Sequence, residues 1–244
     1  MTSERFTPRV GLDESGKGDY FGPLVAAAAA VVDSRVELEL ARLGVADSKR
    51  ISDGRCLELA EAMRGLVPAR VVVIGPARYN ELYGRMQNVN RILAWAHARA
   101  LEDLLAEVSV ERVVADQFAK DPGTLDAALM ARGRTVSVRQ LPHAEADLAV
   151  AAASVIARAR FLRELDRLSE LASLELPKGA THVEAAAVEL VRRGGLSYLG
   201  RFAKLHFATT KRVMAFHAGA PEAGEEARWR TGARPRRSSR GGPW

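Results

Sequence analysis

The order of apolar and polar residues along the chain separates five short strands from several longer helices. Continuous apolar runs bounded by turn-forming residues are typical of buried strands. Such runs occur at 9–14, 24–33, 69–74, 110–115 and 135–141. The alanines at 26–30 would also suit a helix by propensity, but the Gly22-Pro23 pair in front of them and the valines behind them favour a strand.

Helical spacing of apolar residues marks most of the remaining chain. The clearest case is 88–108, where apolar residues recur on one face of a helix. In the long helix predicted at 146–171, we expect Arg158, Arg163 and Arg167 on the outer face. Three strands followed by strands that alternate with helices predict an α/β fold with a mixed sheet. Further helices are predicted around 56–63, 125–131, 182–193 and 199–215.

The composition indicates a globular protein, and its net charge suggests an anionic partner. Of the 244 residues, 48% are hydrophobic and 27% are charged, which is typical of soluble proteins that bury a core. The formal net charge of +6 favours an anionic partner. Cys56 is the single cysteine, so no internal disulfide can form, and a reducing environment is expected.

The two ends of the chain bear on its location and its domains. The N-terminus lacks the apolar segment of a signal peptide, and the longest apolar run, 24–32, is too short to cross a bilayer. We therefore expect a cytoplasmic protein that does not act at a membrane. The segment 218–244 is rich in Ala, Gly, Arg, Ser and Pro, which predicts a disordered basic tail behind one domain at 1–217.

The stretch from Val10 to Leu24 concentrates residues that could carry chemistry. Asp13 and Glu14 end an apolar run, and Lys17 follows between two glycines. Carboxylates suit a hard divalent cation, while a lysine and unobstructed backbone N–H groups suit a phosphate. Metal-assisted phosphodiester chemistry needs both kinds of group. Taken alone, Asp-Glu-Ser-Gly would fit a solvated turn equally well.

Three further acids follow predicted strands or open a predicted helix. Asp116 closes the strand at 110–115, and it would lie at the same sheet edge as Asp13 if the two strands are neighbours. Alone, Asp116 would fit a helix cap or a turn. Glu145 and Asp147 fall in the first turn of the long helix, where the helix macrodipole stabilises acids without any further role.

Several separated motifs, in the right order, resemble those of the type 2 ribonucleases H. Asp13-Glu-Ser-Gly-Lys-Gly-Asp-Tyr-Phe-Gly-Pro-Leu24 is similar to the opening motif in its ribonuclease HIII version, whereas ribonuclease HII typically has Gly-Arg-Gly in place of Gly16-Lys17-Gly18. Asp116-Gln-Phe118 resembles the segment of the family's third acid, and the similarity runs from about 8 to 215. It implies a ribonuclease H-like mixed sheet of about five strands, flanked by helices and followed by C-terminal helices.

The resemblance also implies a reaction and a metal site. The activity would be hydrolysis of the RNA strand of RNA–DNA hybrids, with 5′-phosphate and 3′-hydroxyl products. Two Mg²⁺ or Mn²⁺ ions would neutralise acids that otherwise repel one another. The implied catalytic acids and metal ligands are Asp13, Glu14, Asp116 and Glu145. Glu145 is assigned through His143-Ala-Glu145, where the family typically has lysine before the alanine, so Asp147 stays a rival for the fourth position.

The same resemblance implies the residues that bind the substrate. The turn Ser15, Gly16, Lys17 and Gly18 would read the 2′-hydroxyl in the minor groove. Ser48, Lys49, Asn88 and Asn90 would hold backbone phosphates. Phosphate contacts carry no sequence information, so cleavage independent of sequence is expected. No obligate protein partner is indicated, and a monomer is expected.

Other functions remain open at this point. Ribonuclease HIII usually carries an additional N-terminal substrate-binding domain, whereas here the motif begins almost at the first residue, so we expect a catalytic core without that domain. Ribonuclease HII-like cleavage at single ribonucleotides, a DNA nuclease and a non-catalytic hybrid-binding module are the alternatives. A P-loop is excluded, because Lys17 is followed by Gly-Asp and not by Ser or Thr at the start of a helix. The histidines show no metal-ligand spacing, and only His143 is expected near the site.

Overall fold

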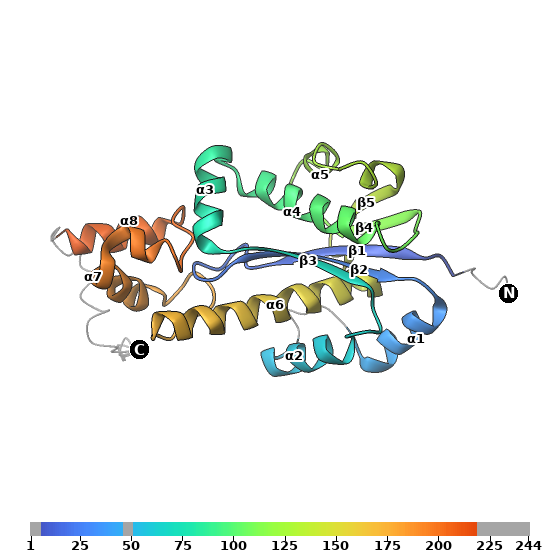
Figure 1. The fold of residues 1–244 in the computed structure, drawn as a ribbon, viewed down its shortest axis with the longest axis horizontal. Coiled ribbons are helices and arrows are strands. Elements are labelled where there is room, and N and C mark those ends of the chain that lie inside the picture. Colours follow the sequence, from blue (N-terminus) through green and yellow to red (C-terminus); the bar gives the residue numbers. More distant parts are fainter. Residues whose placement is uncertain (1–5, 46–50, 219–244) are drawn as a thin grey trace, which may run out of the picture.

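A mixed five-stranded sheet forms the centre of the molecule (Figure 1). The computed structural model describes residues 6–45 and 51–218. β1 is antiparallel to β2, and β2 to β3, whereas β1, β4 and β5 run parallel to one another. The strands are β1 (Arg9–Ser15), β2 (Leu24–Val31), β3 (Ala69–Ile74), β4 (Arg112–Asp116) and β5 (Ser137–Leu141), in the spatial order β3-β2-β1-β4-β5. The mixed sheet of about five strands predicted from the sequence is therefore confirmed.

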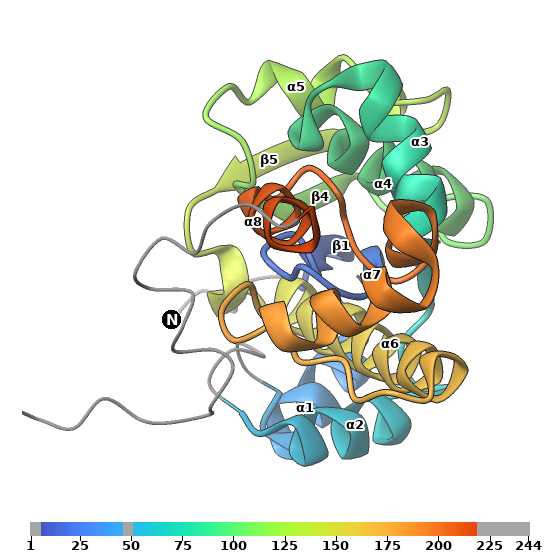
Figure 2. The same cartoon turned by 90° about the vertical axis from the view of Figure 1, so that its left-hand side faces the viewer.

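Helices cover both faces of this sheet and one of its ends. On one face lie α3 (Pro76–Met86), α4 (Val89–Leu104) and α5 (Gly123–Asp126), and on the other lie α1 (Ser34–Leu43), α2 (Asp53–Ala62) and α6 (Leu148–Ala172) (Figure 1). The helices α7 (Glu184–Leu199) and α8 (Ala208–His217) lie together in front of one end of the sheet in Figure 2. Within 6–45 and 51–218, no helix combines the length and apolar character that a membrane crossing requires.

The alanine-rich strand β2 is buried on both faces. Ala27 and Ala29 belong to the core on the α6 side, whereas Ala26 and Ala28 belong to the core on the α4 side. Side chains alternate between the two faces of a strand, so every residue of β2 meets one helix layer or the other. Packing between two helix layers thus outweighs the helix propensity of alanine, and the strand prediction is confirmed.

The helix α6 lies directly against β1. A Cβ atom on Gly11 would lie 2.1 Å from the carbonyl carbon of Ala149, so only glycine allows this close approach. The N-cap of α6 is Asp147, whose Oδ1 accepts a hydrogen bond from Ala149 N at 2.8 Å. One end of α6 is therefore fixed beside the start of β1, and the helix continues past the end of that strand, where Phe161 lies under Gly16.

Two C-terminal segments hold the turn that joins β1 to β2. Tyr20 N donates to Gly179 O at 2.8 Å, and Gly179 N donates to Asp19 Oδ1 at 2.6 Å. Lys204 N donates to Tyr20 O at 2.8 Å, and its Nζ donates to Gly22 O at 2.7 Å. Lys204 is fully buried, and burial lowers the pKa of its ammonium group to about 7. The C-terminal region therefore fixes the conformation of the turn.

The apolar pattern does not predict α1 or α3. In α1 the N-cap Asp33 accepts from Val36 N at 2.8 Å, but Val36, Leu38 and Leu40 alternate with glutamates, a spacing that is also typical of a strand. In α3 the first residue is Pro76, where the missing N–H removes no helical hydrogen bond. In the sequence, the same Gly75-Pro76 pair indicates the end of a strand, so the helix that follows it was not predicted.

The helices predicted at 125–131 and 199–215 are wrong in part. The first is a single turn at Gly123–Asp126. In the second region α7 continues to Leu199 through a kink at Gly194 and Gly195, and turns occupy 200–207 before α8 begins. These turns exist because Phe202 O accepts from Gly22 N at 3.0 Å, so this backbone pairs with the β1–β2 turn. The basic tail from 219 onward lies outside the described residues.

Candidate active site

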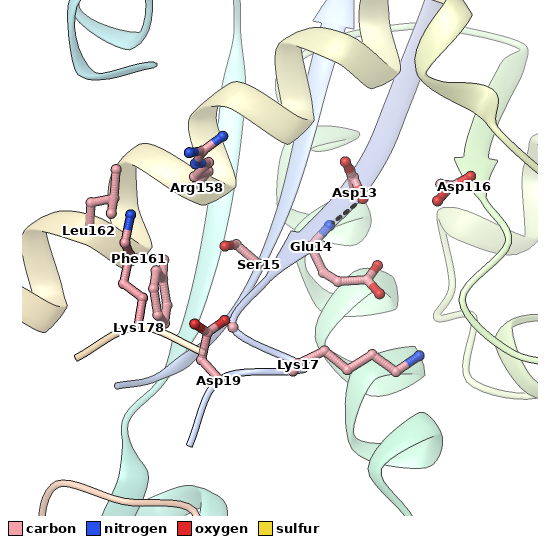
Figure 3. Close-up of a pocket in the computed structure, with 12 residues that line it drawn as sticks. Asp13, Glu14, Ser15, Lys17, Asp19, Asp116, Arg158, Phe161, Leu162 and Lys178 are labelled. Atoms are coloured by element: carbon pink, nitrogen blue, oxygen red, sulfur yellow. Dashed lines mark hydrogen bonds between the residues drawn. The ribbon is translucent and has the colours of Figure 1, made fainter. Parts of the chain in front are cut away.

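Four carboxylates line one cavity at the carboxyl ends of β1 and β4, three of them at the strand ends and the fourth, Asp19, in the turn after β1 (Figure 3). Asp13 and Glu14 lie near the end of β1, and Asp116 ends the neighbouring parallel strand, where Ala115 pairs with Leu12. The structure thus brings Asp13 and Asp116 to the same edge, as their places at strand ends predict. The cavity has a volume of about 570 Å³ and is lined by Asp13, Glu14, Ser15, Gly16, Lys17, Gly18, Asp19, Asp116, Arg158, Phe161, Leu162 and Lys178.

Asp13 is the most buried of the three acids, with 5% of its surface exposed. Its Oδ1 accepts from Glu14 N at 2.7 Å, and the side chain of Ser154 on α6 is also hydrogen-bonded to it. Burial, and then the negative charge of Glu14, raise the pKa of Asp13 to about 7. A nearby cation would favour the ionised form of this carboxyl group.

Glu14 points to the opposite face of the sheet, because successive residues of a strand alternate. Its Oε2 lies 3.1 Å from Nε2 of His97, a residue of α4 that is 1% exposed. The imidazole ring of His97 lies 5.1 Å from the ring of Phe118. Each of the two adjacent acids is therefore held by the helix that covers its own face, Asp13 by α6 and Glu14 by α4.

Asp116 is bound to the segment that carries the two candidates for a fourth acid. Ala144 N donates to Asp116 Oδ1 at 3.1 Å. Ala144–Ala146 forms a separate 3-10 turn, so Glu145 adjoins this contact, half-buried and outside the residues that line the cavity. Asp147 instead caps α6 and pairs with Arg9 Nε at 2.7 Å. The expectation that both acids lie in the first turn of the helix is wrong, since α6 begins at Leu148.

The glycine-framed turn borders the acids. Gly16 has a φ of +88°, and a Cβ atom there would lie 2.1 Å from Pro23 O, so the turn requires glycine. Lys17 Nζ donates to the backbone oxygen of Phe118 at 2.6 Å and lies 5.8 Å from the centroid of the Phe118 ring. All four residues predicted to read the substrate, 15–18, line the cavity. Gly18 is exposed and open to a large ligand.

Two basic side chains line the part of the cavity away from Asp116 (Figure 3). Arg158 from α6 pairs with Asp53 Oδ1 at 2.7 Å, and Lys178 forms an ion pair with the other oxygen of Asp53. Burial opposes ionisation of Asp53, but hydrogen bonds from Lys178 and Arg158 outweigh it and lower its pKa. The expectation that Arg158 lies on the outer face of the helix is wrong, because α2 packs there and supplies its partner.

Asn88 and Asn90, two of the other predicted substrate contacts, do not line the cavity. Asn88 is the N-cap of α4, and its Oδ1 accepts from Asn90 N at 2.8 Å. Oδ1 of Asn90 is buried, and no described residue is hydrogen-bonded to it. Ser48 and Lys49 lie outside the described residues.

Sequence reasoning missed His97, and its expectation that only His143 is near the site is wrong. His97 falls on the apolar face of the helix predicted at 88–108, between the buried residues Leu93 and Leu101. A polar residue within a buried stripe was the available signal. Ser154 and Lys178 were missed as well, because only the packing of α6 and of the loop before α7 reveals them.

The donor set suits a hard divalent cation. Such ions bind carboxylate oxygens, and Mg²⁺ is characteristically held by one or two carboxylates together with water and substrate phosphate. Burial, and then the negative charge of Glu14, raise the pKa of Asp13, and a cation would neutralise that charge. Within the described residues, no group of three or more His, Cys, Asp or Glu side chains could hold a metal ion as it stands. Asp13, Glu14 and Asp116 share the cavity without forming such a group, and their oxygens are of the type that hard divalent cations prefer.

The fold and the acids at its sheet edge define a ribonuclease H-like protein. A family model described as Ribonuclease HII matches residues 10–210. The chain belongs to this family, the type 2 ribonucleases H, and is a hydrolase of the ribonuclease H class.

Relatives that are similar to the chain are named ribonuclease HIII. The chain is 40% identical over 204 residues to ribonuclease HIII of Chlamydia pneumoniae, a match that covers 83% of the chain and 68% of the relative. It is 40% identical over 209 residues to ribonuclease HIII of Protochlamydia amoebophila, covering 85% and 69%. The crystal structure of Bst-RNase HIII in complex with Mn²⁺ matches with a TM-score of 0.79 and 36% identity, covering 86% of this chain and 70% of that one.

Proposed function

We propose that the protein is a metal-dependent endonuclease that hydrolyses the RNA strand of RNA–DNA hybrids and leaves 5′-phosphate and 3′-hydroxyl ends. One observation carries the proposal: Asp13 and Asp116, on neighbouring parallel strands, line the same cavity as the Lys17 turn. Acidic ligands for a cation and a backbone turn suited to the substrate thus meet in one place. Membership of the type 2 ribonucleases H supports this assignment.

The proposed ligands of Mg²⁺ or Mn²⁺ are the carboxylates of Asp13, Glu14, Asp116 and Glu145. When bound, two such ions supply activation of the attacking water and stabilisation of the leaving 3′-oxygen. Ser154 and His97 hold Asp13 and Glu14 in place, on opposite faces of β1. That the similar Bst-RNase HIII was solved as a complex with Mn²⁺ supports a divalent ion.

The remaining polar groups of the cavity would bind the hybrid. We assign reading of the 2′-hydroxyl to the backbone of 15–18, because a glycine-rich turn can approach the minor groove closely. Arg158 and Lys178 suit backbone phosphates of the same duplex. Ser48, Lys49, Asn88 and Asn90 remain proposed phosphate contacts on the strength of the family motifs. We further propose that the protein acts as a monomer in the cytoplasm, through a domain at 1–217.

The test is cleavage of three labelled duplexes in Mg²⁺ or Mn²⁺, with the products sized. They are a full RNA–DNA hybrid, a DNA duplex with one embedded ribonucleotide, and a duplex of DNA alone. We expect cutting of the hybrid at many positions and no cutting of DNA. Cutting only at the single ribonucleotide would assign a ribonuclease HII-like specificity, and binding without any cutting would leave a hybrid-binding module.

A further inference from the structure

His97 is a polar side chain in an apolar environment. It is 1% exposed, and Leu93 and Leu101 of the same helix face are fully buried beside it. Its Nε2 lies 3.1 Å from Glu14 Oε2. Its Nδ1 is also buried, and no described residue is hydrogen-bonded to that atom. Among the described residues, the imidazole ring is therefore hydrogen-bonded only to a carboxylate that lines the cavity.

The direction of this hydrogen bond follows from the chemistry of the two groups. An ionised carboxylate can only accept, so the N–H of a neutral imidazole must be on Nε2 to make the bond. Nδ1 is then a buried polar atom with no partner among the described residues, and burying such an atom costs stability. Leucine would fill this apolar position without that cost. The contact with Glu14 therefore points to a role of His97 other than packing.

The ring is also held from its other side. Phe118 packs against it with ring centroids 5.1 Å apart and planes inclined by 31°. The carbonyl oxygen of Phe118 accepts from Lys17 Nζ at 2.6 Å. Phe118 lies two residues after Asp116, so Glu14, His97, Phe118 and Lys17 connect the acids of both strands to the glycine-framed turn. The imidazole ring is thereby packed against a residue that also binds Lys17 of the turn.

We propose that His97 is a positioning residue, which holds one oxygen of Glu14 so that the carboxylate faces the cavity in a single orientation. A carboxylate held in this way loses less conformational freedom when it binds a cation. The affinity of the site for its divalent ion is then set in part by a residue that does not touch the ion. This inference rests on the proposed function, because it takes Glu14 as a ligand.

The test compares three substitutions at position 97. The amide nitrogen of Gln reaches about as far as Nε2 of histidine, whereas that of Asn reaches only as far as Nδ1. His97→Gln can therefore still donate to Glu14, but His97→Asn cannot, although both keep a polar side chain. His97→Leu removes the donor and retains apolar volume. His206→Asn is the matched control, because His206 also packs on aromatic rings, also has an unpartnered Nδ1, and lies outside the cavity.

The readouts are the dissociation constant for Mn²⁺, measured by calorimetry on metal-free protein, and the thermal unfolding midpoint. We expect His97→Asn and His97→Leu to weaken Mn²⁺ binding about 10- to 100-fold, and His97→Gln to stay close to the wild type. His206→Asn should leave the Mn²⁺ affinity unchanged. Hybrid binding without metal should be the same in all variants that fold.

Equal Mn²⁺ affinity of wild type, His97→Gln and His97→Asn would overturn the positioning role. If His97→Leu does not fold, the comparison of the Gln and Asn variants still decides. If the wild type and His97→Asn both bind Mn²⁺ equally well and both cut the hybrid, the role of His97 is overturned and the proposed function stands. A wild-type protein that neither binds Mn²⁺ nor cuts overturns the proposed function together with it.

Discussion

Asp147 and Arg9 form an ion pair, with Oδ2 and Nε 2.7 Å apart, beside the start of β1. The other oxygen of Asp147 caps α6 by accepting from Ala149 N at 2.8 Å. Arg9 also pairs with Glu37 at 2.6 Å, which fixes the guanidinium group. Asp147 thus uses one oxygen to cap α6 and the other to bind Arg9 of β1, at the end of the strand away from the cavity. Both oxygens are engaged there, which favours Glu145 as the fourth acid.

Separate substitutions of Glu145 and Asp147 test which of them is the fourth acid. Glu145→Gln should lower hybrid cleavage at least about 100-fold, because a proposed ligand is lost. Asp147→Asn should keep activity, since asparagine also caps helices well. Asp147→Ala should lower the free energy of unfolding by about 1–2 kcal/mol through the lost cap, with activity kept at low temperature. Initial cleavage rates and urea unfolding measure these effects, and the reverse pattern would assign the fourth position to Asp147.

Replacement of Asp13 should separate catalysis from binding. Asp13→Asn is expected to abolish cleavage and to spare hybrid binding, because only the proposed metal ligand changes. Gel-shift assays and cleavage of the same labelled hybrid provide the measurement. Turnover close to that of the wild type would remove Asp13 from the site.

The same variant tests the raised pKa of Asp13. Burial and Glu14 raise this pKa from 3.8 to about 7, so between these values the folded state binds a proton that the unfolded state has lost. This group therefore lowers stability as pH rises through that window, by up to about 1.4 kcal/mol per pH unit. In EDTA, Asp13→Asn should gain stability relative to wild type between pH 5 and 7, which urea unfolding measures. If the unfolding free energies of the wild type and Asp13→Asn change with pH in parallel, the raised pKa of Asp13 is contradicted.

The two glycines of the turn provide a matched pair. A Cβ atom at Gly16 would lie 2.1 Å from Pro23 O, whereas a Cβ at Gly18 would meet nothing within 4 Å. Gly16→Ala should therefore lower the thermal midpoint and the activity together. Gly18→Ala should leave the midpoint unchanged and weaken hybrid binding, if the turn faces the minor groove. Unchanged hybrid affinity in a folded Gly18→Ala variant would place the duplex elsewhere.

Lys204 should give a pH dependence of stability with the opposite sign. Burial lowers its pKa from 10.5 to about 7, so between these values the unfolded state binds a proton that the folded state lacks. Stability contributed by this position then rises with pH, by up to about 1.4 kcal/mol per unit. The unfolding free energy of the wild type minus that of Lys204→Met should increase from pH 7 to pH 9.5. A constant difference would contradict a neutral buried amine.

The sequence predicts the sheet better than it predicts the contacts of the site. Apolar runs identify the five strands, and Asp13 and Asp116 can be placed together because parallel neighbours end at a common edge. By contrast, His97 meets Glu14 and Ser154 meets Asp13 only through helices packed on opposite faces of β1. Arg158 faces α2 for the same reason. Such pairings depend on the packing of segments far apart along the chain, which no local pattern encodes.

The buried side chain of Lys204 also bears on the order in which the parts of the cavity are synthesised. Translation proceeds from the N-terminus, so Asp13, Glu14 and Asp116 leave the ribosome well before Lys204. Until then the β1–β2 turn lacks the bonds that Lys204 makes to Tyr20 and Gly22. A nascent chain would therefore contain the acids without the closed turn. The conformation of the β1–β2 turn thus depends on synthesis of the segment that carries Lys204.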